Sequence, residues 1–234
     1  MILYCFCISL LTLIPLLLTI AFFTLAERKI IAAVQRRKGP NVVGYWGLLQ
    51  PFADGLKLIL KEVTVPFQAS KVVFILAPWL IFFLSILNWA FLPTSYSDVI
   101  CDPAYSLLYF YLLSSLSVYS LIFAGWASKS KYPFLGAIRS AAQIISYEVS
   151  IGLILLILVL ITHSLNILDV VYWQYQNAWL IFYLTPLCVI FVISTIAETN
   201  RAPFDLPEAE AEIVAGYNLE YSAITFAFSI SSFL

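Results

Sequence analysis

The sequence predicts an all-α membrane protein with about six transmembrane helices and one interfacial amphipathic helix, in a single membrane domain of residues 1–234. Of these residues, 62% are hydrophobic and only 11% are charged, whereas soluble domains carry roughly 25% charged residues. The mean hydropathy is +0.97, so too few charged side chains remain to cover a water-exposed globule. The net charge of −1 indicates no nucleic-acid partner.

Stretches almost free of charged residues mark the expected spans, because a helix of about 20 apolar residues crosses the hydrocarbon core. Five of them are long enough: 1–26, 72–97, 103–128, 140–169 and 170–197. Glu148 interrupts the fourth. The fifth opens with polar residues, so its apolar core is expected to begin near Ala178. A sixth apolar stretch runs from near Ile213 to Leu234 and contains Glu220.

The basic residues indicate the orientation of the chain. All twelve Lys and Arg residues fall in the connections after the first, third and fifth spans, and the charged residues of the opposite connections are Asp98, Asp102 and Asp169. By the positive-inside rule the basic side is the cytoplasm, or the matrix of a mitochondrion. The N-terminus then lies on the intermembrane-space side. An apolar start, in place of a basic targeting signal, favours a retained first span.

The segment after the first span combines basic residues with glycines. Arg28 and Lys29 stand at the end of the span, where basic residues are ordinarily lipid-headgroup anchors. The sequence Gly-Pro-Asn at 39–41, followed by Gly44 and Gly47, predicts a tightly folded loop.

Residues 51–62 have the pattern of an amphipathic helix. Apolar residues at helical spacing form one face: Phe52, Leu56, Ile59 and Leu60. Charged residues mark the other face: Asp54, Lys57 and Lys61. About 12 residues are too few to span a membrane, so this helix is expected to lie along the basic-side interface. Packing on a partner protein is the alternative, and the two are compatible.

Glu148 is the strongest candidate for chemistry, because an ionisable group inside a span is costly and is a functional hypothesis by default. Polar residues gather on the opposite face of the same helix: Arg139, Gln143, Ser146, Tyr147 and Ser150. This helix is therefore expected to be surrounded by protein or internal water. Buried carboxylates can load and unload protons near neutral pH. A structural hydrogen bond to a neighbouring helix is the alternative.

The connection after the fifth span is unusually acidic for the basic side of the membrane. Its carboxylates are Glu198, Asp205, Glu208, Glu210 and Glu212, and Arg201 is its one cation. Pro203 and Pro207 interrupt regular helix and permit a re-entrant path. Irregular backbone at membrane depth needs protein or a water-filled cavity beside it. Closely spaced carboxylates titrate as a group, and a solvated acidic loop is the alternative.

The sequence lacks the signatures of several cofactor classes. The four cysteines form no C-x-x-C pair, and we interpret them as small buried hydrophobic residues: Cys5, Cys7, Cys101 and Cys188. His163 is the only histidine, which excludes a bis-histidine haem and favours a surface or interface role. No phosphate-binding or dinucleotide-binding glycine motif is present. The chain alone is therefore expected to bind no nucleotide, haem, metal or iron–sulfur cluster.

Four stretches of sequence carry a more specific signal. They read ERK at 27–29, QRRKGPNVVGYWGLLQPFADGLKLILKE at 35–62, GWASKSKYPFLGAIRSAAQIISYEVSIGL at 125–153 and AETNRAPFDLPEAEAEIVAGYNLEY at 197–221. Each closely resembles the subunit 1 family of respiratory complex I (NADH:quinone oxidoreductase), which is the membrane subunit at the quinone pocket. The spans between these stretches match that family in hydropathy only.

The resemblance implies a place in the membrane arm, where the family lines the tunnel by which ubiquinone reaches the terminal iron–sulfur cluster. The family's carboxylates begin a chain of buried ionisable groups that leads toward the proton-pumping subunits. Carried over to this sequence, the quinone-chamber residues are Arg28, Phe52, Asp54, Arg201, Phe204, Asp205, Glu208, Glu210 and Glu212. The proton-route residues are Tyr147, Glu148, Glu198 and Glu220.

The expected function is that of a non-redox subunit in an NADH:ubiquinone reductase that translocates protons. Ubiquinone would be the substrate, while NADH, FMN and iron–sulfur clusters would belong to partner subunits. Expected partners are the hydrophilic quinone-site subunits, adjacent small membrane subunits and lipids of the mitochondrial inner membrane or a bacterial plasma membrane. Two alternatives stay open: a proton- or cation-coupled secondary transporter, and the homologous subunit of a membrane-bound hydrogenase.

The family normally continues for two spans beyond the sixth, so the chain resembles its N-terminal part. We expect a separate polypeptide to supply the remaining spans, with a truncated chain as the alternative.

Overall fold

The computed structural model describes residues 2–93, 99–201, 203–205 and 216–232, and within these ranges its regular elements are all helical. The prediction of an all-α protein is therefore confirmed. The chain divides into two compact units. One contains Met1–Thr64 with Tyr221–Ser232, and the other contains Val65–Glu220. The prediction of a single membrane domain stays a prediction.

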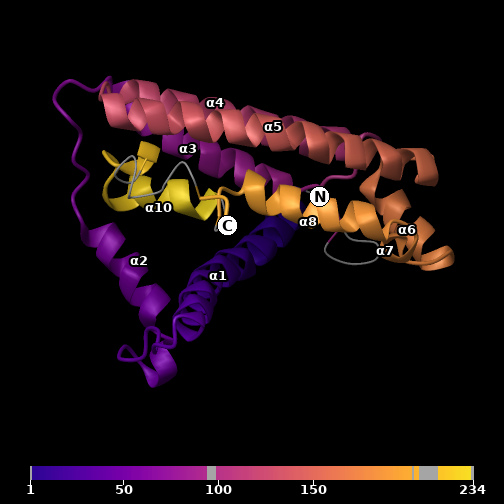
Figure 1. Ribbon diagram of the computed structural model, residues 1–234, viewed down its shortest axis with the longest axis horizontal. Helices are drawn as coiled ribbons and strands as arrows, with labels where there is room; N and C mark the ends of the chain where they lie inside the picture. Colours follow the sequence, from indigo (N-terminus) through magenta and orange to yellow (C-terminus); the bar gives the residue numbers. More distant parts are fainter. Residues whose placement is uncertain (1, 94–98, 202, 206–215, 233–234) are drawn as a thin grey trace. The chain divides into compact units, whose positions relative to one another are not determined.

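The first unit is built from α1 (Ile2–Val34), the short helix η1 (Tyr45–Gly47), α2 (Gln50–Leu60) and α10 (Ala223–Ser232). The predicted first span ended at Ala26, but α1 continues through the basic residues to Val34. The amphipathic helix predicted at 51–62 is α2. In Figure 1, α1 and α2 form two arms joined by the basic loop, and α10 packs against α2.

The loop between α1 and α2 is tight because it uses glycine where other residues are excluded. Gly47 has a φ of 75°, and a Cβ atom at this position would lie only 2.2 Å from the carbonyl oxygen of Pro40. The side chain of Lys29 donates a hydrogen bond to the carbonyl of Trp46, which ties the loop to α1. The tightly folded loop expected from the sequence is thus present.

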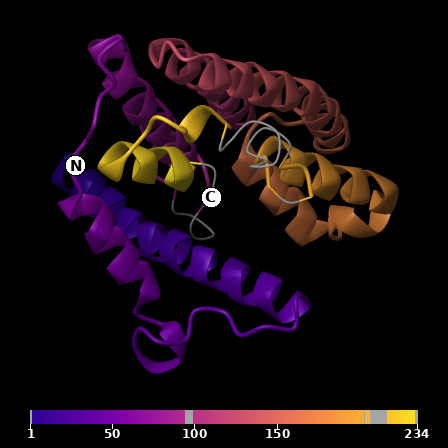
Figure 2. The ribbon, with the colours of Figure 1, turned by 60° about the vertical axis from the view of Figure 1, so that its left-hand side comes forward.

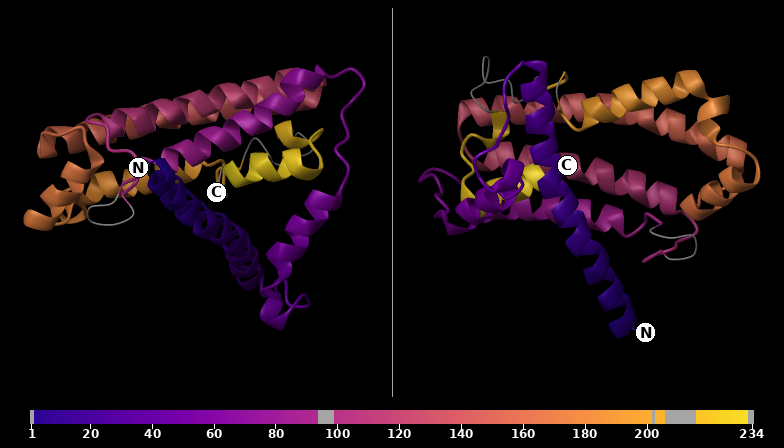
Figure 3. Two further views of the ribbon diagram at one scale, coloured as in Figure 1. Left: turned by 180° about the vertical axis from the view of Figure 1, so that it is seen from behind. Right: turned by 90° about the horizontal axis from the view of Figure 1, so that it is seen from below.

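The second unit centres on three long helices, α3 (Lys71–Trp89), α4 (Ser106–Ala127) and α5 (Lys131–Thr162). In the described part of the chain, these three are long and apolar enough to cross a membrane by length and composition. They correspond to the predicted second, third and fourth spans. Figures 1 and 3 show them side by side, with α4 between α3 and α5 in the packing.

Small residues allow α4 and α5 to approach closely. A Cβ atom on Gly125 would lie 2.3 Å from the Cβ of Ala137 and 3.1 Å from the carbonyl oxygen of Pro133. Small residues at helix contacts are typical of membrane bundles, where close backbone packing replaces the hydrophobic driving force. Phe74 from α3 and Leu121 from α4 are fully buried in the same unit.

The predicted fifth span is broken into three pieces: α6 (Ile167–Gln176), α7 (Leu180–Tyr183) and α8 (Thr185–Glu198). Figure 2 shows this broken path folding back alongside α5. The apolar core expected to begin near Ala178 does not form one helix, because non-helical Leu184 precedes α8 and Pro186 fits only the first turn of α8. With 14 residues, α8 is about 21 Å long, shorter than the hydrocarbon core of about 30 Å.

The predicted sixth span also differs from the structure. Ile213 lies outside the described residues, the 3-10 helix η2 occupies Gly216–Asn218, and α10 begins only at Ala223. Glu220 therefore lies in a turn between η2 and α10 and not within a helix. The total of six spans stays a prediction.

The interpretation of the cysteines as buried hydrophobic residues needs correction. Cys101 is exposed in the connection between α3 and α4, where its N–H donates to the carbonyl of Ala90. Cys188 on α8 is half-buried, and both thiols are free. The side chains of Cys5 and Cys7 lie outside the described part of the structure.

Candidate functional site

Glu148 is buried in the middle of α5, with only 7% of its surface exposed. Its Oε1 atom has no hydrogen-bond partner among the described residues. Ser114 of α4 lies near the carboxylate, and its hydroxyl donates to the backbone carbonyl of Tyr111 at 2.8 Å. The hydroxyl of Tyr111, also from α4, donates to the backbone carbonyl of Glu148 at 3.2 Å. The predicted buried carboxylate is therefore held between α5 and α4.

A second carboxylate, Glu198 at the end of α8, belongs to the same cluster. Glu198 and Glu148 are close enough to interact electrostatically, and each also interacts with Tyr111. Three helices of one unit thus bring together two carboxyl groups and a phenol. Clusters of ionisable groups away from bulk water are typical of functional sites. The sequence predicted both carboxylates but not Tyr111, which is one of several aromatic residues in its span.

Gln143 hydrogen-bonds the end of α8 and the connection after it to α5, the helix that carries Glu148. Its Nε2 atom donates to the carbonyl oxygen of Ala197 at 2.9 Å and to that of Phe204 at 2.9 Å. The ring of Phe204 in turn contacts the ring of Tyr147, with centroids 6.0 Å apart at 57°. Tyr147, predicted on the proton route, therefore faces the acidic connection, one helical position away from Glu148.

The remaining predicted residues of this unit are only partly described. Arg201 and Asp205 are half-buried in the connection after α8, and Glu220 is half-buried in the turn after η2. Glu208, Glu210 and Glu212 lie outside the described residues. In the described part of the chain, no group of three or more His, Cys, Asp and Glu side chains is placed to hold a metal ion.

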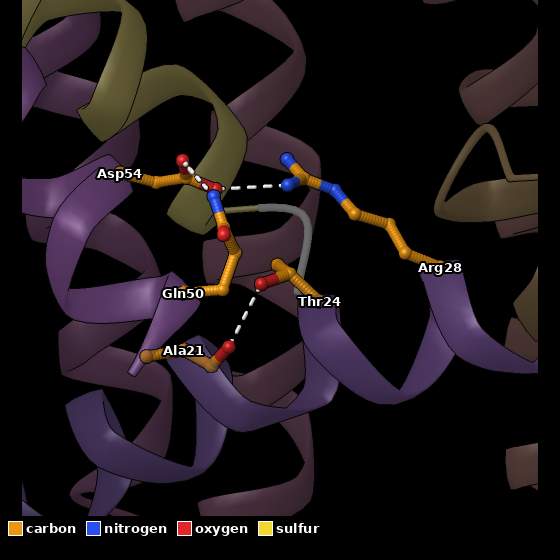
Figure 4. A network of polar contacts seen from close by, with 5 residues as sticks. All are labelled: Ala21, Thr24, Arg28, Gln50 and Asp54. Atoms are coloured by element: carbon orange, nitrogen blue, oxygen red, sulfur yellow. Dashed lines mark hydrogen bonds and ion pairs between the residues drawn. The ribbon is translucent and has the colours of Figure 1, made fainter. Parts of the chain in front are cut away.

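The other unit holds a second predicted set, at the contact of α1 with α2. Arg28 Nη1 forms an ion pair with Asp54 Oδ2 at 2.8 Å, and Gln50 Nε2 donates to Asp54 Oδ1 at 2.9 Å, as Figure 4 shows. The ring of Phe52 meets Phe22 edge-on at 6.0 Å and remains 51% exposed. Arg28 and Asp54 are thus in direct contact, and Phe52 packs against Phe22 of the same α1 helix. A quinone-chamber role for the three residues stays a prediction.

These observations define the class first: a helical membrane protein with an internal cluster of carboxylates and, in the other unit, an ion pair beside exposed apolar rings. Comparison with known proteins then gives the family. The family model described as NADH dehydrogenase matches residues 8–233. The chain belongs to this family, and the resemblance drawn from the four stretches of sequence is confirmed.

Individual relatives agree with this assignment. NADH-ubiquinone oxidoreductase chain 1 of Chondrus crispus is 57% identical over 214 residues, covering 92% of this chain and 65% of the relative. An NADH-quinone oxidoreductase subunit of the bacterium Paramagnetospirillum magneticum is 58% identical, and the match covers 92% of this chain and 62% of that relative. NADH-ubiquinone oxidoreductase chain 1 of Arabidopsis thaliana is 58% identical, and the match covers 92% of this chain and 66% of that relative. The chain therefore spans a little under two thirds of the length of these relatives.

Proposed function

We propose that this chain acts within the membrane subunit of an NADH–quinone oxidoreductase, in a mitochondrial inner membrane or a bacterial plasma membrane. In this role it binds no redox cofactor of its own and works beside subunits that carry NADH, FMN and iron–sulfur chemistry. The names of its relatives support the class of complex. Family membership also favours this function over a secondary transporter or a hydrogenase subunit.

The finer proposal is that Glu148 and Glu198 hold and pass protons when quinone is reduced. The observation that carries it is the burial of Glu148, with one carboxylate oxygen unpartnered, next to a second carboxyl group and a phenol. A buried carboxylate is costly to keep charged. Such a site exchanges protons readily when a nearby charge changes. Tyr147 and Glu220 are proposed as further members of the route.

The proposal includes a quinone-binding role for the second set. Phe52 offers an exposed ring on an amphipathic helix, and Asp54, which pairs with Arg28, lies two residues further along the same helix. An apolar surface edged by a few polar groups suits a quinone, which has a long apolar tail and two carbonyl oxygens. In the other unit, the residues proposed for a quinone-binding role are Arg201, Phe204, Asp205, Glu208, Glu210 and Glu212.

Glu148→Gln tests the proton role, because it keeps the size of the side chain and removes its titration. We expect the assembled complex to oxidise NADH normally with a hydrophilic artificial acceptor, but to lose quinone-linked turnover by about 100-fold, the usual scale for a general acid–base group. Glu62→Gln, the same change at an exposed carboxylate, is the control. Normal quinone turnover with normal proton pumping in Glu148→Gln would exclude Glu148 from the route.

A further inference from the structure

Tyr111 reaches from α4 to the backbone of α5 at the residue that carries the buried carboxylate. Its hydroxyl donates to the carbonyl of Glu148 at 3.2 Å. In an α-helix this carbonyl also accepts the N–H of residue 152, so Tyr111 is a second donor to the same oxygen. Ser114 follows Tyr111 by three positions and lies beside the Glu148 carboxylate. Tyr111 therefore holds Glu148 by its backbone carbonyl, while the Ser114 hydroxyl on the same face of α4 donates to the carbonyl of Tyr111 at 2.8 Å.

Gly152 on α5 makes room for the tyrosine ring. A Cβ atom on Gly152 would lie 2.8 Å from the Tyr111 hydroxyl oxygen, 3.0 Å from Cζ and 3.2 Å from Cε2. An alanine Cβ would therefore require the tip of the tyrosine side chain, which makes the hydrogen bond to the Glu148 carbonyl, to shift. Glycine inside a helix costs up to about 1 kcal/mol relative to alanine, so its presence here has a packing reason.

The surroundings of Tyr111 are apolar on one side. The ring lines a hollow of about 470 Å³ between α4 and α5. The other residues of this hollow are glycine or aliphatic, including Leu108, Val149 and Leu156. On the inner side are the two carboxyl groups with which Tyr111 interacts electrostatically, Glu148 and Glu198. The phenol thus stands at the boundary between an apolar hollow and the carboxylate cluster.

We propose that Tyr111, seated against Gly152, is a positioning residue that fixes Glu148 relative to Glu198. The inference rests on the proposed proton role of Glu148 and names the contact that sets its geometry. Proton transfer between two groups requires hydrogen-bond reach, directly or through one water. A rotation or slide of α5 at Glu148 would therefore slow transfer without removing either carboxylate.

Tyr111→Phe in the assembled complex is the first test, because it removes the hydroxyl and keeps the ring. We expect kcat for quinone-linked NADH oxidation to fall about two- to tenfold, the value of one hydrogen bond, with KM for quinone and artificial-acceptor activity unchanged. Gly152→Ala should cause a similar fall, and the double variant should be no worse than the more impaired single variant, since both act on one contact. Tyr119→Phe is the control, on the same helix but 58% exposed.

Three results would overturn the proposal. The first is wild-type kcat in Tyr111→Phe. The second is an equal fall in Tyr119→Phe, or in artificial-acceptor activity, which would indicate a general packing role. The third is additive loss in the double variant. If Glu148→Gln is impaired while Tyr111→Phe is not, the positioning role fails and the proton role stands. If Glu148→Gln is fully active, both fail.

Discussion

Gly136→Ala tests the tightest backbone contact in the second unit. Gly136 lies on α5 where η2 crosses it, and both Gly136 and Gly216 are buried. A Cβ atom on Gly136 would lie 2.8 Å from the Cα of Gly216, 2.9 Å from its carbonyl carbon and 2.9 Å from the nitrogen of Tyr217. All three obstructing atoms belong to the backbone, so no rotamer change can relieve the contact.

The magnitude follows from two opposing terms. Overpacking a tight contact costs about 1–3 kcal/mol, and backbone obstruction places this site in the upper half of that range, at about 2–3 kcal/mol. Alanine is a better helix former than glycine by up to about 1 kcal/mol, which offsets part of the cost. We therefore expect a net destabilisation of about 1–2 kcal/mol at the packing of η2 on α5.

The assay is the thermal midpoint of the purified complex, together with the amount of assembled complex in membranes. Gly55→Ala is the matched control, because a Cβ atom at that position on α2 meets nothing within 4 Å. Gly55→Ala should be neutral or stabilising, while Gly136→Ala should lower the midpoint and the yield. A Gly136→Ala complex as stable as wild type, or an equal loss in Gly55→Ala, would refute the argument from close backbone contact.

Two further predictions concern polar contacts. Asp54→Asn removes the ion pair with Arg28; because these side chains are 57% and 40% exposed, stability should fall by less than about 1 kcal/mol. KM for quinone should nevertheless rise in steady-state assays, and an unchanged KM would contradict the quinone-binding role. Asn166→Ala removes the cap that accepts from Leu168 N–H at 2.9 Å and the hydrogen bond to Asp102 at 2.7 Å, so the thermal midpoint should fall by the equivalent of about 1 kcal/mol or more. Asn177→Ala, which loses a hydrogen bond within its own helical turn, should have a smaller effect; equal midpoints would contradict this reasoning.

The sequence was sufficient to predict helices whose ends are set by composition. The start expected at Val72 for the second span is within one residue of the start of α3, and the amphipathic helix expected at Pro51 begins at Gln50. The break between α6 and α8 was not predictable from hydropathy, because it depends on local backbone conformation at Asn177 and Leu184. Polar residues at 172–177 indicated a later start for the apolar core, but the break at Leu184 lies within apolar sequence.

Site residues were predictable from the sequence where a charged residue interrupts an apolar segment. They were not predictable where the choice of residue depends on which face of a helix packs against its neighbour. Glu148 is conspicuous in sequence because ionisable groups are rare inside spans. Tyr111 is one of four tyrosines between Tyr105 and Tyr119, and only packing selects it, through the space at Gly152. Gln143 was recognised as polar, but its two carbonyl partners, one in the last turn of α8 and one in the connection after it, are more than 50 residues away.

The polar residues of α5 explain where this helix is covered by its own chain. An unpartnered polar group in hydrocarbon costs several kcal/mol, and α5 carries polar groups on two faces. The Gln143 face is covered by the connection after α8, and the Glu148 face is covered by α4 through Tyr111. Gly136 lies where the segment at Gly216 packs on α5, and Gly152 lies where Tyr111 of α4 packs on α5. Glycines on α5 thus permit the close packing that lets a carboxylate remain inside a span, and a single added methyl group at either position should disturb that protection before it disturbs the helix itself.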